Sequence, residues 1–144
     1  MSLVEEISQL HLVGVALGAG VGAMCRGGLD IAVIRRVGVT RLPWATLVVN
    51  VVGTFILGLV LGWSAAVAAD RMSSASQVED AVTLELVIGT GFAGGLTTFS
   101  TFSWESFRLV GEGRQRAMLT YAALTLGLTL LAVSGGIALG RWFG

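Results

Sequence analysis

The sequence predicts an all-α integral membrane protein with four membrane-spanning helices, the third of which is broken mid-membrane. Composition is the first reason: 54% of the residues are hydrophobic, 12% are charged, and the mean hydropathy is +0.83. A soluble globular domain carries about 25% charged residues, so this chain has too few to cover a water-facing surface. The second reason is a set of four apolar runs, each long enough for the roughly 20 helical residues that cross a bilayer.

The chain of 144 residues is predicted to be one membrane domain, residues 1–144, with spans at residues 10–34, 44–69, 84–106 and 117–140. The first span is uncharged until Arg26, which stands four residues before Asp30. Residues four apart share a helix face, so these two side chains can pair or extend toward the membrane surface.

The second span follows Pro43 directly, and proline suits a helix start. The connection over residues 70–83 contains several serines and is predicted to be a flexible polar loop.

Glycines recur at four-residue spacing in three of the spans. In lipid such patterns let helix backbones approach closely, so they predict a compact bundle without indicating a function. They are Gly14, Gly18 and Gly22 in the first span, Gly58 and Gly62 in the second, and Gly136 and Gly140 in the fourth.

The distribution of arginine predicts an orientation. All nine basic residues are Arg, and six of them flank the loops between spans one and two and between spans three and four: Arg35, Arg36, Arg41, Arg108, Arg114 and Arg116. The opposite side holds Arg71 and Arg141, with the partly embedded Arg26 left out. Because basic residues concentrate in cytoplasmic loops, both termini are predicted to lie outside the cytoplasm.

The third span carries 19 uncharged residues between Glu85 and Glu105, including four Gly and six Ser or Thr. Glycine costs about 1 kcal/mol in a helix interior, and threonine adds crowding and backbone competition. Residues 94–98 are therefore predicted to interrupt the helix at mid-membrane depth, where unsatisfied backbone must be buried in protein or line a polar cavity. Transport proteins place ion sites at such breaks, with freed carbonyls binding cations. The alternative is an intact, glycine-rich packing helix.

Two phenylalanines follow the predicted break on one helix face, Phe99 and Phe102, with Ser100 and Thr101 between them. The edge of an aromatic ring is electropositive, so ring edges beside hydroxyl donors would form a weak anion path. A full positive charge there could hold an anion too tightly for rapid conduction.

Polar residues in the other spans add to this picture. Asn50 is the strongest polar group of the second span and is predicted to line a cavity or to join helices. Tyr121, Thr125 and Thr129 form a polar stripe in the fourth span, although the two threonines can instead bond their own helix backbone.

Several functional classes are disfavoured. One cysteine, Cys25, and one histidine, His11, are too few for a zinc or haem site or a His-based triad, so no enzyme is expected. The net charge is zero, which does not resemble a basic nucleic-acid-binding surface.

Three segments carry a resemblance to a known family: residues 91–103 (GFAGGLTTFSTFS) with Glu105, residues 50–55 (NVVGTF), and the Gly-rich run from Gly18 to Arg26. On these segments the sequence resembles the Fluc (CrcB) fluoride channels over nearly its whole length. Ala93 stands where many members have Cys, and two threonines of the fourth span stand where many have Ser.

The resemblance implies a function and an assembly. Members of the family are fluoride-selective channels of the prokaryotic plasma membrane that export fluoride passively from the cytoplasm. They form antiparallel, dual-topology dimers with two fluoride pores and a central structural Na⁺ that is not transported. The carbonyls of Gly94 and Thr97 would bind Na⁺, with two chains supplying four oxygens.

The same resemblance implies roles in the pore. Asn50 would meet fluoride with its amide, while Phe99 and Phe102 would offer ring edges. Arg26 would lend positive potential to an entrance, unless it pairs with Asp30. Five hydroxyl-bearing residues would recruit or guide the anion: Ser100 and Thr101 near a vestibule, and Tyr121, Thr125 and Thr129 along the pore.

The arginine bias disagrees with dual topology, which requires little bias. The expected partner is therefore a second copy of the chain or a paralogue of opposite topology in a heterodimer. Two other functions remain open from the sequence: a proton-coupled exporter of the small multidrug type and a non-conducting structural membrane protein. The exporter would need an embedded carboxylate in the first span, where Asp30 is the sole candidate.

Overall fold

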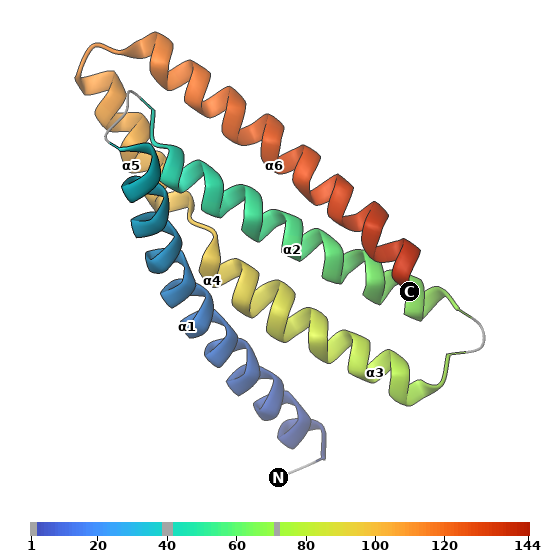
Figure 1. Cartoon of the computed structure of the whole chain (residues 1–144). Helices are drawn as coiled ribbons and strands as arrows, with labels where there is room; N and C mark the ends of the chain where they lie inside the picture. Colours follow the sequence, from blue (N-terminus) through green and yellow to red (C-terminus); the bar gives the residue numbers. More distant parts are fainter. Residues whose placement is uncertain (1–2, 39–41, 71–72) are drawn as a thin grey trace.

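The computed structural model describes residues 3–38, 42–70 and 73–144, and gives side chains of the first helix from Gln9 onward. All regular secondary structure in these residues is helical (Figure 1). The elements are α1 (Leu3–Val37), α2 (Trp44–Ala69), α3 (Ala75–Leu84), the π-helical segment η1 (Glu85–Ala93), α4 (Gly94–Leu96), α5 (Phe99–Gly111) and α6 (Gln115–Phe143). Arg41 and Arg71, two arginines used to predict the orientation, lie outside the described residues.

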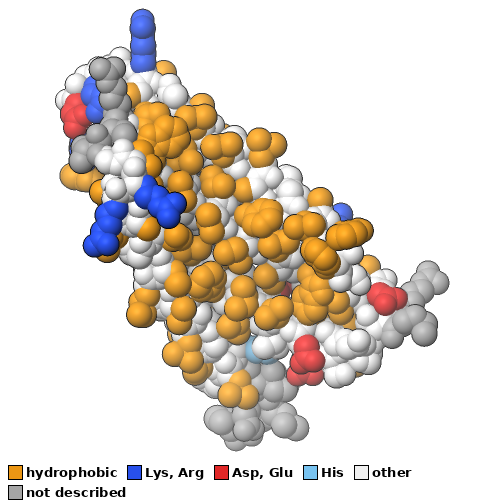
Figure 2. Space-filling view, viewed as in Figure 1, with side chains coloured by type: hydrophobic (Ala, Val, Ile, Leu, Met, Phe, Trp, Pro, Cys, Tyr) orange, Lys and Arg blue, Asp and Glu red, His pale blue; other side chains and the backbone are white. Residues whose placement is uncertain are grey.

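Four helical stretches are long and apolar enough to cross a membrane: Gln9–Val37, Trp44–Ala69, Ala75–Gly111 and Gln115–Phe143. They alternate in direction, so α1 and the third stretch run one way and α2 and α6 the other (Figure 1). A broad band of hydrophobic side chains covers the visible surface, and charged groups gather toward the ends (Figure 2). The prediction of an all-α protein with four membrane helices is confirmed.

Glycines bring α2 and α6 into backbone contact. A Cβ added at Gly58 or Gly62 would collide with the carbonyl oxygen of Val133 or Ile137 on α6. In return, a Cβ at Gly140 would collide with the carbonyl oxygen of Leu59 on α2. The predicted close packing at these positions is confirmed, because no larger side chain fits without separating the helices.

A second glycine contact joins α1 to the third stretch. A Cβ at Gly22 would collide with the carbonyl oxygen of Phe92, and one at Gly95 with that of Ala19. A Cβ at Gly91 would lie 2.7 Å from the carbonyl oxygen of Val15. Gly91 and Gly95 of the third stretch therefore serve packing against α1, whereas a Cβ at Gly89 would face Leu57 of α2 and one at Gly94 would meet nothing within 4 Å.

The predicted loop over residues 70–83 is wrong for its second half, since α3 begins at Ala75. The Ser74 hydroxyl accepts a hydrogen bond from the backbone N–H of Gln77 (3.3 Å), and the Gln77 side chain accepts one from the backbone N–H of Ser74 (2.8 Å). This reciprocal pair is a capping box, which starts a helix. Ser74 therefore marks the start of a helix and not only a polar loop.

The interruption of the third stretch falls at the last two residues of the predicted segment. Thr97 and Thr98 have extended backbones, with φ/ψ of −73°/158° and −148°/119°. Gly94–Leu96 remain helical, so within the predicted segment 94–98 the extended backbone is confined to the two threonines. Glycine weakens a helix but accepts helical angles readily, and here Gly95 is needed for the contact with α1.

Candidate functional site

The site is built around the extended pair Thr97 and Thr98. Thr98 is the N-cap of α5, and its hydroxyl accepts a hydrogen bond from the backbone N–H of Thr101 at 3.2 Å. Threonine is favoured at this position because its short side chain satisfies one of the amides that a helix start leaves unpaired. The new helix therefore begins at Phe99 and directs the residues after it.

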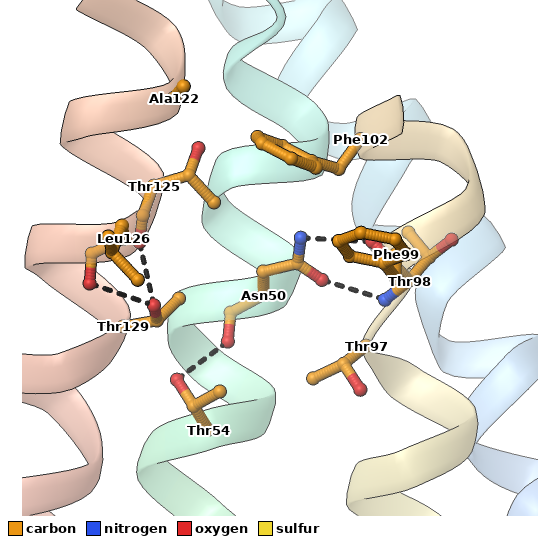
Figure 3. A pocket seen from close by; sticks show the side chains of 10 residues that line it. All are labelled: Asn50, Thr54, Thr97, Thr98, Phe99, Phe102, Ala122, Thr125, Leu126 and Thr129. Atoms are coloured by element: carbon orange, nitrogen blue, oxygen red, sulfur yellow. Dashed lines mark hydrogen bonds between the residues drawn. The ribbon is translucent and has the colours of Figure 1, made fainter. Parts of the chain in front are cut away.

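Asn50, which lies on α2, binds the interrupted backbone through two hydrogen bonds. Its Nδ2 donates to the carbonyl oxygen of Thr98 at 3.1 Å, and its Oδ1 accepts from the backbone N–H of Thr98 at 2.7 Å (Figure 3). Both residues are buried. The sequence left open whether Asn50 lines a cavity or joins helices, and in the structure it does both.

A cavity of about 280 Å³ lies beside this bond, between α2, α5 and α6 (Figure 3). Among the described residues that line it, no side chain carries a charge. Its lining comprises Asn50, Thr54, Thr97, Thr98, Phe99, Phe102, Ala122, Thr125, Leu126 and Thr129. Five predicted pore residues are thus brought together: Asn50, Phe99, Phe102, Thr125 and Thr129.

The two phenylalanine rings of the cavity lie next to each other, with centroids 5.8 Å apart. Phe99 is 79% exposed in the single chain, so most of its ring faces outward. Phe102 is more enclosed and also contacts the Tyr121 ring, at a centroid distance of 5.3 Å. The Phe102 ring is therefore supported by Tyr121, whereas the Phe99 ring projects from the protomer.

The two threonines of the fourth-span stripe differ. The Thr129 hydroxyl donates to the carbonyl oxygens of Thr125 (2.7 Å) and Leu126 (3.1 Å) on its own helix. The Thr125 hydroxyl oxygen is buried and has no hydrogen-bond partner within the described residues. A buried hydroxyl without a partner is costly, so Thr125 is a lining residue whose donor is not used by any described group of the protomer.

Three predicted pore residues are not among the described residues lining this cavity. Tyr121 is fully buried, and its hydroxyl donates to the Glu105 carboxylate at 2.9 Å. The hydroxyls of Ser100 and Thr101 lie 3.3 and 3.0 Å from that of Thr98, in a small cluster at the start of α5. Ser100 is exposed, so this cluster reaches the surface of the protomer.

Arg26 does not form the ion pair with Asp30 that the sequence allowed, as judged over the described residues. Its guanidinium donates instead to the carbonyl oxygen of Thr97, at 3.4 Å. One carboxylate oxygen of Asp30 is buried and has no partner in the described part of the chain. Arg26 thus brings its charge to the interruption, through a contact made possible by the close packing of α1.

The donor set at the site suits a hard cation better than a transition metal. No group of three His, Cys, Asp or Glu side chains that could hold a metal occurs in residues 3–38, 42–70 and 73–144. The oxygens near the interruption are carbonyls and hydroxyls, and Gly94 is exposed on the protomer surface. Neutral oxygens are the ligands of hard cations.

Sequence reasoning missed Thr54 as a lining residue. Its hydroxyl donates to the carbonyl oxygens of Asn50 (2.8 Å) and Val51 (3.1 Å), and the residue lines the same cavity. The signal was its position four residues after Asn50, which places both on one helix face. Leu126 was missed as well, and no polar signal marks it.

Taken together, the fold and the site define a multi-pass membrane protein with a neutral, hydroxyl-bearing cavity against an interrupted helix. The chain belongs to the CrcB family. The family model described as CrcB-like protein, Camphor Resistance (CrcB), matches residues 13–137.

Relatives agree with this membership over most of their length. The fluoride-specific ion channel FluC of Chloroflexus aurantiacus is 37% identical over 134 residues, which cover 93% of this chain and 98% of the relative. That of Salinibacter ruber is 41% identical over 133 residues, covering 90% of each. The fluoride-specific ion channel FluC 1 of Yersinia pseudotuberculosis is 41% identical over 128 residues, covering 89% and 86%.

Proposed function

We propose that this protein is a fluoride-selective channel of the bacterial plasma membrane that lets fluoride leave the cytoplasm passively. The observation that carries the proposal is the near full-length similarity to bacterial relatives named as fluoride-specific ion channels. These relatives are channels by name, which supports conduction rather than catalysis.

The cavity chemistry supports an anion path. Fluoride is a strong hydrogen-bond acceptor, so a conducting site needs donors that replace its water without trapping it. The Thr125 hydroxyl is a buried donor with no partner among the described residues, and the Phe99 and Phe102 rings can offer their electropositive edges. A neutral lining binds the ion weakly enough for release.

The remaining predicted residues take supporting positions in this proposal. Ser100 and Thr101 would recruit the anion where their hydroxyl cluster reaches the surface, and Arg26 would add positive potential near the interruption. Asn50 would offer its remaining amide hydrogen to the ion, and Thr129 would extend the path. Tyr121 would hold the Phe102 ring in position through the contact between the two rings.

An antiparallel dimer completes the proposed channel, either of two copies or with a paralogue of opposite topology. Two groups at the interruption support a partner: Gly94 is exposed, and Phe99 leaves 79% of its surface uncovered. The interruption would lie near the bilayer midplane, on the axis between the two chains. There the carbonyls of Gly94 and Thr97 from each chain would hold Na⁺, whose role would be to join the protomers.

Ion efflux from proteoliposomes tests the function. Fluoride efflux without chloride efflux, at a rate independent of a proton gradient, is the expected result. Proton-dependent flux would instead favour the exporter alternative, for which Asp30 is the candidate carboxylate. No flux of either anion from liposomes shown to contain folded dimer would favour a structural protein.

A further inference from the structure

Two amide groups at the interruption do not make their helical hydrogen bonds. In a continuous α-helix the N–H of each residue donates to the carbonyl oxygen four residues earlier. Thr98 would then donate to Gly94, and Thr101 to Thr97. In the structure Thr98 N–H donates to the Asn50 side chain at 2.7 Å, and Thr101 N–H donates to the Thr98 hydroxyl at 3.2 Å.

Within the described residues, the carbonyls of Gly94 and Thr97 accept only long contacts. The Gly94 oxygen accepts from the Thr97 hydroxyl at 3.3 Å, and the Thr97 oxygen accepts from Arg26 at 3.4 Å. Hydrogen bonds in proteins are about 2.5–3.0 Å for hydroxyl donors and about 2.7–3.2 Å for N–H donors. Both contacts exceed these ranges, so neither replaces the helical hydrogen bond that the carbonyl has lost.

We propose that Asn50 and Thr98 are positioning residues for the central cation: their side chains redirect the two amides that would otherwise occupy the Gly94 and Thr97 carbonyls. This inference rests on the proposed function and assigns Asn50 a second role. Its carboxamide holds the Thr98 backbone at both the N–H and the carbonyl, so the buried polar groups satisfy one another across α2 and α5. Breaking that pair lets Thr98 N–H return to its helical acceptor, because a buried amide left unpaired is costly.

The experiment compares the sodium dependence of dimer assembly in full-length variants. Subunit exchange between donor- and acceptor-labelled protein is followed by FRET in detergent, while Na⁺ replaces N-methylglucamine at constant ionic strength. Thr98→Val removes the accepting hydroxyl but keeps the branched shape, and Thr98→Ser restores the hydroxyl. Asn50→Leu removes the side-chain acceptor on α2. The matched control is Ser103→Ala on α5, because that hydroxyl bonds only the backbone of its own helix in the described residues, and Ser103 is not among those lining the cavity.

The wild-type dimer should be longer-lived in Na⁺ than in N-methylglucamine. In Thr98→Val and Asn50→Leu the Na⁺ concentration for half-maximal stabilisation should rise by about tenfold or more, which corresponds to about 1.4 kcal/mol. Thr98→Ser and Ser103→Ala should keep the wild-type midpoint.

Two results would overturn the inference. One is an unchanged Na⁺ midpoint in both Thr98→Val and Asn50→Leu; the other is a dimer weakened equally in both cations, which a purely structural role predicts. If the lifetime of the wild-type dimer did not depend on Na⁺, the proposed cation site would be wrong, and this inference would be wrong with it. Fluoride efflux from the same wild-type preparation is a separate readout, so the channel proposal stands or fails independently.

Discussion

The hydroxyl of Tyr121 donates a 2.9 Å hydrogen bond to the carboxylate of Glu105 and thereby joins α6 to α5. The ring of the same tyrosine is fully buried and packs against Phe102, one of the two rings of the cavity. Tyr121 thus braces the lining from behind. Tyr121, which the family resemblance assigns to the pore, therefore lies behind the cavity, where its ring supports that of Phe102.

Tyr121→Phe should lower stability while keeping the ring contact with Phe102. A hydrogen bond to a charged group contributes about 1.5–3 kcal/mol, and its loss leaves the Glu105 carboxylate without this donor. Thermal unfolding of the purified protein measures the effect. Ser106→Ala is the matched control, because that hydroxyl bonds only the backbone of its own helix within the described residues. Reduced fluoride efflux with an unchanged unfolding temperature would contradict bracing and favour direct contact with the ion.

Phe99→Ile should nearly abolish fluoride efflux and leave the dimer intact. Isoleucine keeps a comparable apolar side chain but lacks the electropositive ring edge that we propose meets the anion. The measurement is efflux from proteoliposomes, with dimer content checked by cross-linking. Phe107→Ile provides the control, since Phe107 is another largely exposed phenylalanine of α5 that packs against Trp104 and is not among the described lining residues. Normal efflux in Phe99→Ile would remove Phe99 from the pore.

Thr125→Val should reduce fluoride efflux by about 10- to 100-fold, the equivalent of one lost hydrogen bond to an ion. Its unfolding temperature should not fall, because the substitution removes a buried hydroxyl without a partner in the described residues. Thr125→Ser should retain conduction.

Thr129→Val is the comparison for this prediction, because the Thr129 hydroxyl is already bonded to its own helix. Its effect on efflux should be smaller than that of Thr125→Val. Equal effects of the two substitutions would show that the difference in hydrogen bonding does not matter to conduction.

Gly58→Ala should destabilise the protein by about 1–3 kcal/mol, the usual cost of forcing a methyl group into a packed interior. The added carbon would meet the backbone of Val133, which cannot rotate away. Gly127→Ala on α6 is the control, since a Cβ there meets no described atom within 4 Å. That variant should be as stable as the wild type or slightly more so, because alanine favours a helix over glycine. Equal unfolding temperatures for the two variants would contradict the close α2–α6 contact.

The sequence alone determined the class of fold and the region of the site. The length and low charge of the four apolar runs require lipid as solvent, and these properties do not depend on how the helices pack. The four-residue glycine spacing likewise predicted close contacts, because it places the gaps on one helix face. Residues 94–98 stood out because glycine and threonine both weaken a helix.

Tertiary structure decided which of these local possibilities was used. Thr98 rather than Gly94 carries the interruption, because Asn50, 48 residues away in sequence, supplies an alternative partner for its backbone. Thr125 and Thr129 look alike in sequence, yet only one hydroxyl is bonded among the described residues. Composition and spacing set what a segment can form. The choice among partners depends on which groups the packed helices bring within hydrogen-bonding distance.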